Sequence, residues 1–143
     1  MRRYSILVIL YLIIYTNISA ATNPQYSVIG TWEAKVPDGK TIVTFVFKEN
    51  GSIDWIVTQK ASASSKMRSH TAKAKYTIRP GINFINIDVY GFDVKGAQNM
   101  IFLGIIQFKD KDTILMEGRP GPKSSTTHRP KAFSKQFLEF KKK

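Results

Sequence analysis

The residue types that carry out catalysis are scarce in this sequence. It contains two histidines, His70 and His128, and no cysteine, which excludes a thiol nucleophile and a cysteine-bound metal. Each histidine lies in a stretch rich in Lys, Ser and Thr, and neither adjoins a Gly-x-Ser-x-Gly motif. Their separation also gives no metal-ligand spacing. We therefore expect two solvent-exposed histidines, no catalytic residues, no metal site and no cofactor.

Two acidic residues, Asp54 and Asp88, lie within runs that are typical of strands. Paired carboxylates can perform general acid–base catalysis, and a buried Asp54 would be a candidate ligand anchor. Because Ile53, Trp55 and Val57 alternate with Asp54, however, these apolar side chains favour one common face. We expect Trp55 to face the interior and Asp54 to face solvent, in a protein that is not an enzyme.

The elements that must position these residues are predicted to be short strands joined by turns. Asn50-Gly51 separates two runs of β-branched and aromatic residues and is a strong hairpin signal, while Pro37-Asp38-Gly39 predicts a tight turn. The pattern predicts strands at residues 28–36, 41–47, 52–58, 71–79, 83–90, 100–108, 113–116 and 133–140, with longer loops at 61–69, 91–98 and 118–132.

Eight such strands without a convincing helix predict an all-β fold, an eight-stranded antiparallel up-and-down barrel. Closure removes the exposed edges of the sheet. A barrel of this size is either filled by side chains or holds one small ligand, and the strand aromatics fit both alternatives. The candidate cavity-lining residues are Phe45, Phe47, Trp55, Tyr76, Phe84 and Phe102. The strand at 100–108 is apolar on both faces, so we expect the N-terminal lead-in or a partner to cover its outer face.

The N-terminus is typical of a secretory signal peptide. Arg2 and Arg3 precede an apolar run at 6–15, and the small residues Ser19-Ala20-Ala21 follow it. We expect cleavage before Thr22, with a cut before Ala21 as the alternative. The apolar run is shorter than the ~20 residues that a spanning helix needs, so no transmembrane segment is expected after cleavage.

This prediction divides the chain into a signal peptide at 1–21 and one barrel domain at 22–143. The mature domain is expected to be secreted or periplasmic, and the sequence leaves that choice open. Without cysteine it has no disulfides, so its core alone must stabilise it, as a domain of this length can. We expect a monomer.

The formal net charge of the chain is +12, and the cations are unevenly distributed. An exported basic protein is expected to meet an anionic surface or an acidic protein rather than nucleic acid, unless its charge serves only solubility. The candidate basic surface consists of Lys60, Lys66, Arg68, Lys73, Lys75, Lys141, Lys142 and Lys143.

One further motif lies at the head of the strands. Gly30-Thr31-Trp32-Glu33 would bring a single indole to the closed end of the barrel, with glycine leaving room beside the ring. This start of an eight-strand meander resembles the opening motif of lipocalins and other calycins. The chain is similar to the bacterial lipocalin-like exported domains known mainly from planctomycetes, a family of uncharacterised function. The other matching pieces are Tyr76-Thr77-Ile78, Ile85-Asn86-Ile87, Gly104-Ile105-Ile106-Gln107-Phe108, Asp112-Thr113-Ile114-Leu115 and Arg129-Pro130-Lys131-Ala132-Phe133.

The resemblance implies a calycin-like barrel with a binding role and no catalytic residues. In calycin barrels a late arginine often packs over the opening tryptophan, so Arg129 or Arg119 is expected to close the barrel against Trp32. We expect an exported lipocalin-like protein that holds a small apolar or amphipathic ligand in the barrel. The alternative is a solid barrel whose basic 59–75 segment and C-terminal tail dock an acidic protein or an anionic envelope surface.

Overall fold

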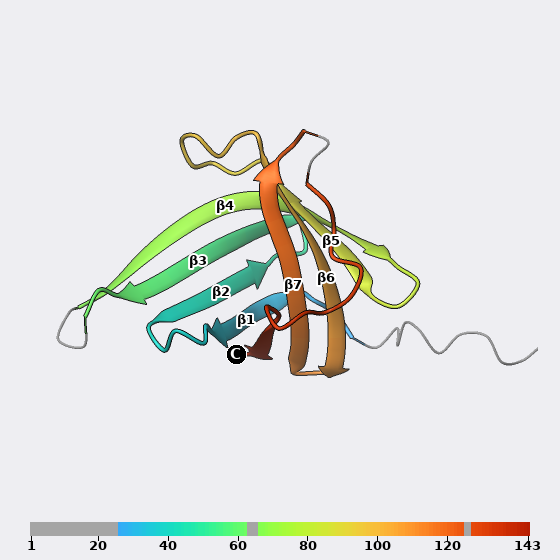
Figure 1. Ribbon diagram of the computed structural model, residues 1–143, viewed down its shortest axis with the longest axis horizontal. Coiled ribbons are helices and arrows are strands. Elements are labelled where there is room, and N and C mark those ends of the chain that lie inside the picture. Colours follow the sequence, from blue (N-terminus) through green and yellow to red (C-terminus); the bar gives the residue numbers. More distant parts are fainter. Residues whose placement is uncertain (1–25, 63–65, 125–126) are drawn as a thin grey trace, which may run out of the picture.

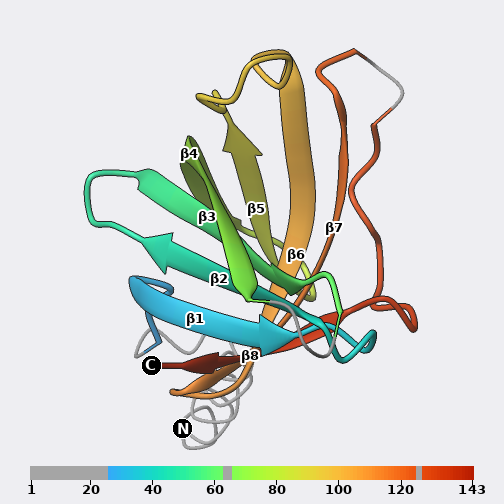
Figure 2. The same ribbon diagram turned by 90° about the vertical axis from the view of Figure 1, so that its left-hand side faces the viewer.

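Eight strands follow one another around a closed antiparallel barrel, in which each strand pairs with the next and β1 pairs with β8 (Figures 1 and 2). A computed structural model describes residues 26–62, 66–124 and 127–143, so the predicted signal peptide lies outside the described residues. The strands are β1 (Gly30–Lys35), β2 (Thr41–Phe47), β3 (Ser52–Lys60), β4 (Met67–Pro80), β5 (Ile85–Tyr90), β6 (Met100–Asp110), β7 (Thr113–Pro122) and β8 (Leu138–Lys142). The predicted all-β up-and-down barrel is confirmed.

Local turn chemistry sets the first two hairpins, as the sequence predicts. Gly39 and Gly51 both adopt positive φ angles, 69° and 78°, which glycine reaches without strain. Asp38 accepts hydrogen bonds from the backbone N–H groups of Lys40 and Thr41 and from the Thr41 hydroxyl. The Thr41 hydroxyl and these two N–H groups hold the pKa of the Asp38 carboxyl below its ordinary value. The turn therefore favours the ionised carboxylate.

The inward faces of the strands form one apolar core. Its largest fully buried side chains on these faces are Trp32, Phe47, Ile53, Ile87, Val89, Ile106, Ile114 and Phe140. Gly104 and Gly118 lie opposite each other on β6 and β7, and the ring of Phe102 occupies the space beside them. A Cβ added at Gly118 would lie 2.0 Å from Phe102 Cζ, and one at Gly104 would lie 2.7 Å from Phe102 Cε1. The two glycines thus create the room that this aromatic ring needs.

Three predicted boundaries are wrong, because pairing with a neighbouring strand outweighs local composition. β4 already begins at Met67, so the serine-rich segment is a shorter connection than expected. β7 continues to Pro122, paired with β6, although this stretch is rich in Pro and Gly. Beyond Met116 the other edge of β7 has no strand partner among the described residues, and proline is tolerated at such an edge.

The third wrong boundary concerns the segment before β8. Residues 127–137, which we call the strap, do not belong to the barrel wall but run along the outside of β5, β6 and β7 (Figures 1 and 2). On that outer face Ile105 is fully buried, and the buried carboxylate of Glu117 accepts hydrogen bonds from the Ser134 N–H at 2.6 Å and hydroxyl at 2.8 Å. The strap therefore covers the outer face of β6 that was expected to need an N-terminal or external cover.

No helix in the described part of the chain is long and apolar enough to cross a membrane.

Replacing Gly118 with alanine is expected to lower the free energy of unfolding by about 1–3 kcal/mol, because the new Cβ overlaps the ring of Phe102. Chemical denaturation would measure this. The same substitution in a Phe102→Leu background should cost clearly less, since the shorter side chain leaves room. An equal cost in both backgrounds would contradict the proposed complementarity of ring and glycine.

Candidate functional site

The open end of the barrel contains an apolar cavity, which we call the mouth pocket. Its volume is about 330 Å³. Strand residues that line it are Trp55 and Val57 of β3, His70, Thr71 and Ala72 of β4, Met100 and Ile101 of β6 and Pro120 of β7, and Phe92, Val94 and Ala97 come from the loop at 91–99. This size and lining suit a small apolar molecule more than an ion or a sugar.

The loop at 91–99 is attached to β4 by two backbone-directed hydrogen bonds. The Lys73 N–H donates to Asp93 Oδ1 at 2.7 Å, and the Asp93 N–H donates to the Lys73 carbonyl at 2.9 Å. This attachment brings Phe92 against Trp55, with a distance of 5.9 Å between the ring centroids. The loop is thus positioned by the wall of the barrel, and its aromatic residue completes the pocket.

Most of the predicted cavity residues fill the interior instead of lining a space. Phe45, Phe47 and Phe102 are buried, and the ring of Phe45 packs edge-on against Trp55 at 4.9 Å between centroids. Tyr76 packs edge-on against Phe47 at 5.0 Å, and burial raises the pKa of its hydroxyl. Of the six predicted residues, Trp55 alone lines the mouth pocket. The barrel is therefore filled toward its closed end and hollow toward its open end.

The prediction for Phe84 is wrong. Its ring lies outside the barrel and packs edge-on against Phe133 of the strap, with 5.0 Å between the centroids. The expected strand at 133–140 would have turned Phe133 inward, but the strap crosses the outer face instead. Sequence alternation near residue 84 gave no sign of this, because the partner is supplied by a segment about fifty residues further along the chain.

Arg129 does not stack on Trp32, so the predicted closure by this arginine is wrong. Its guanidinium donates to the carbonyls of Ile87 at 2.8 Å and Gly104 at 2.5 Å, and it forms an ion pair with Asp88. Arg79 contacts the other oxygen of the same carboxylate at 2.5 Å. Arg129 therefore attaches the strap to β5 and β6 on the outer wall.

The cation that lies over Trp32 among the described residues is Lys142, with its Nζ 5.4 Å from the ring centroid. Gly30, at φ 126°, makes this possible, since a Cβ there would lie 3.1 Å from Lys142 Cε. The indole is fully buried, and its N–H donates to the Val28 carbonyl at 2.6 Å. Trp32 thus occupies the closed end as expected, and the C-terminal strand supplies the cation.

The predicted basic surface divides into two parts. Lys60, Lys66, Arg68, Lys73 and Lys75 are all exposed on the β3–β4 hairpin, which projects beyond β1 and β2 (Figure 1). The C-terminal lysines have structural contacts instead: besides Lys142, Lys141 pairs with Glu139 at 3.0 Å and Lys143 with Glu33 at 2.9 Å. Of the predicted basic surface, the part without such structural contacts therefore lies on the hairpin.

The histidines and the two strand carboxylates are not brought together. His70 lines the mouth pocket, whereas His128 lies on the strap, and both are exposed. Asp54 faces outward and pairs with Lys48 at 2.8 Å, as expected. In the described ranges no group of three or more His, Asp or Glu side chains is placed to hold a metal ion.

Apart from Trp55, the lining residues of the mouth pocket were not predicted. Phe92, Val94 and Ala97 among them lie in a glycine-containing loop where alternation carries no information. The apolar residues Phe92 and Val94 on either side of Asp93 are the sequence signal that points to a role at the pocket, and Val94 is 43% exposed.

Replacing Arg129 with alanine is expected to lower the free energy of unfolding by about 2–3 kcal/mol. Three hydrogen bonds that its charged guanidinium donates are lost, and the partly buried carboxylate of Asp88 loses one of its two cationic partners. Arg79→Ala is the matched control, since Arg79 contacts the same carboxylate but is 63% exposed, against 21% for Arg129. In the Arg79→Ala control the free energy of unfolding should fall by less than about 1 kcal/mol. Hydrogen exchange should also accelerate in residues 127–137 only in Arg129→Ala. Equal effects of the two variants would contradict the anchoring role.

No family model matches the chain, and no match was found among curated proteins or solved structures. The functional proposal therefore depends on the geometry of the structure.

Proposed function

We propose that this protein is an exported, non-enzymatic, lipocalin-like carrier that holds a small apolar or amphipathic molecule in the mouth pocket. The observation that carries the proposal is the apolar cavity of about 330 Å³ at the open end of an otherwise filled eight-stranded barrel. Barrels of eight strands are just wide enough for one small ligand, and ligand pockets begin near this volume.

The lining supports selection by shape and apolar contact. Trp55 and Phe92 present large apolar surfaces, and the strand residues Val57, Ala72 and Pro120 complete the wall. His70 and Thr71 supply polar side chains at the same pocket, where an amphipathic ligand would direct its polar end. Ala72 and Ala97 are small, so space for the ligand depends on short side chains at two positions.

The carrier proposal predicts that the neutral dye Nile red binds the wild-type protein and changes the fluorescence of Trp55. Ala72→Phe is expected to weaken this binding by at least about tenfold, because the added ring occupies the pocket. Thr77→Phe is the matched control, since Thr77 lies on the same strand but is exposed on the outer face, and it should bind the dye as the wild type does. Equal affinity in Ala72→Phe would contradict the assignment of the pocket.

Native mass spectrometry of the protein isolated from its exported fraction tests the same proposal without a chosen probe. A small molecule that leaves on denaturation, and that is absent from Ala72→Phe, would support a carrier and give the class of its cargo. A bare mass together with no dye binding would contradict it.

A second candidate function is favoured by the β3–β4 hairpin. No acidic residue occurs between Asp54 and Asp88, while five exposed cations lie along this hairpin, whose tip extends beyond β1 and β2 (Figure 1). Such an array fits an anionic envelope surface, to which the carrier would deliver or from which it would collect its cargo.

The hairpin proposal predicts binding to phosphatidylglycerol vesicles that weakens steeply as salt is raised, because exposed charges are screened beyond about 10 Å at 0.1 M ionic strength. Lys73→Glu with Lys75→Glu should reduce this binding, and vesicles of phosphatidylcholine alone should bind neither protein. Binding that is independent of salt, measured by sedimentation, would contradict it.

A further inference from the structure

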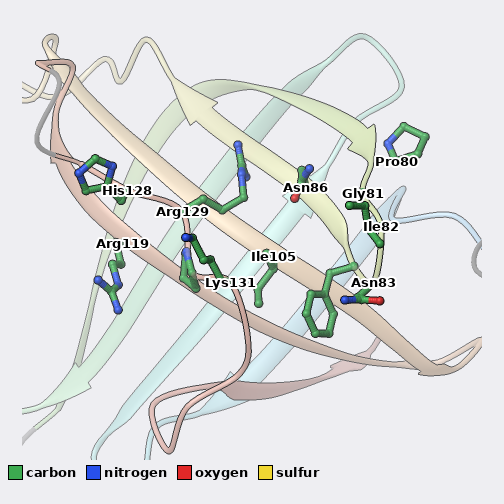
Figure 3. A pocket seen from close by; sticks show the side chains of 12 residues that line it. Pro80, Gly81, Ile82, Asn83, Asn86, Ile105, Arg119, His128, Arg129 and Lys131 are labelled. Carbon is green, nitrogen blue, oxygen red and sulfur yellow. The ribbon is translucent and has the colours of Figure 1, made fainter.

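We propose that a groove on the outer wall of the barrel binds an extended acidic segment of a partner protein. The groove has a volume of about 1240 Å³ and lies between the β4–β5 turn and the strap. Figure 3 shows Arg119, Arg129 and Lys131 together on one side of it, with Asn86 and the turn at Gly81 across from them. Its lining faces away from the barrel interior, so this site is independent of the mouth pocket.

The groove carries positive charge that the protein itself does not compensate. Arg119 and Lys131 line it, and neither side chain makes a hydrogen bond or an ion pair with another residue in the described ranges. No acidic side chain is among its lining residues in this part of the chain. Arg129 differs, because Asp88 already pairs with it. The two unpaired cations, Arg119 and Lys131, therefore favour a ligand that carries negative charge.

One apolar side chain is strongly exposed on the opposite side of the groove. Ile82, at the tip of the β4–β5 turn, is 91% exposed, the largest value among the exposed large apolar side chains. Phe84 is half-buried in the same turn, and the buried side chains of Ile105 and Pro130 complete the apolar part of the lining. A ligand that places one apolar side chain against Ile82 would cover this surface while its acidic groups meet the cations.

Asparagine amides provide the third kind of contact. Asn83 and Asn86 line the groove, and no hydrogen bond is made by either side-chain amide within the described residues. Each amide has a donor and an acceptor side by side, the pair that a peptide group in an extended chain requires. The turn is closely packed here: a Cβ added at Gly81 would lie 2.2 Å from the Phe84 carbonyl oxygen and 3.1 Å from Asn86 Nδ2.

The occupant is not a segment of this chain or a second copy of it. Residues 1–25 contain two arginines and no acidic residue. The acidic residues of the barrel are largely engaged: Glu33, Asp54, Asp88, Asp112 and Glu139 form ion pairs, and Asp38, Asp93, Asp110 and Glu117 accept hydrogen bonds. A copy of the same barrel therefore has no acidic patch to offer, and the ligand must come from another molecule.

The contacts favour a peptide over other polyanions. Proteins that bind single-stranded nucleic acid stack its bases on exposed aromatic rings, whereas Phe84, the aromatic residue in this lining, already packs against Phe133. A sulfated polysaccharide would leave Ile82 uncovered, and a flat membrane would not meet cations that line a groove. An extended acidic peptide with one apolar residue uses all three kinds of contact.

The test uses a fluorescein-labelled peptide of glutamates with one central leucine, and measures its binding by fluorescence anisotropy. Arg119→Glu with Lys131→Glu should weaken binding by at least about tenfold. Lys73→Glu with Lys75→Glu changes the net charge equally but lies on the hairpin, and it should weaken binding by less than about threefold. Equal losses in the two variants would overturn the proposal, because the general charge of the protein would then explain binding.

Two further measurements keep the assignment specific. Ile82→Ser should weaken binding about threefold or more, while Met67→Ser, at another exposed apolar residue, should have no effect. Each variant must retain the circular dichroism spectrum and melting transition of the wild type.

Other polyanions test the class of ligand. If single-stranded DNA or dextran sulfate binds more tightly than the peptide, and Arg119→Glu with Lys131→Glu abolishes that binding, the proposal that the ligand is a peptide would be overturned. No peptide binding by the wild type up to about 1 mM would overturn the site. The Ala72→Phe variant, in which the mouth pocket is filled, should bind the peptide as the wild type does. Failure of the groove proposal can therefore be distinguished from failure of the carrier proposal.

Discussion

The burial of one indole holds the first and last strands of the barrel together. Trp32 of β1 lies opposite Lys142 of β8 in the register, donates its N–H to the chain just before β1, and packs edge-on toward Phe108 of β6. Removing an aromatic side chain of this size from water contributes about 4–6 kcal/mol. Closure of the barrel depends on this contact. Closure in turn separates the interior face of the sheet from its exterior face.

The unequal lengths of the strands explain why the barrel is filled at one end and hollow at the other. β1, β2 and β8 have 6, 7 and 5 residues, whereas β3, β4 and β6 have 9, 14 and 11. All of them contribute side chains near the closed end, where Phe45 stacks on Phe140 at 5.1 Å. β3, β4, β6 and β7 line the mouth pocket, whereas β1, β2 and β8 supply none of its lining residues, so fewer side chains are available there to fill the space. A pocket at the open end follows from this geometry.

The sequence predicted well those features that depend on neighbouring residues. Asn50-Gly51 and Asp38-Gly39 specify their turns locally, and the alternation around Trp55 correctly placed Asp54 outside. The features that failed depend on distant partners. Asp88 and Arg129 are 41 residues apart, and nothing local indicates that they meet.

The same reason limited the prediction of the two sites. One predicted cavity residue, Trp55, lines the mouth pocket, because alternation tells which face a residue takes but not how deep in the barrel it lies. Composition predicts a loop and then a strand from residue 133 for the strap, because local residues do not show that it crosses the outer wall. Only the packing of Phe133 on Phe84 shows that these side chains serve the outer wall.

The pairing of β1 with β8 also dictates an order of events during folding. This contact spans almost the whole described chain, from Trp32 to Lys142, and such long-range pairings form slowly. A chain that emerges from its N-terminus first can form the β1–β2 and β2–β3 hairpins early, but its opening strand keeps an unpaired edge until the last residues arrive. The protein must therefore pass through a stage with an open sheet edge, which is the stage at which it is most exposed to association with other chains.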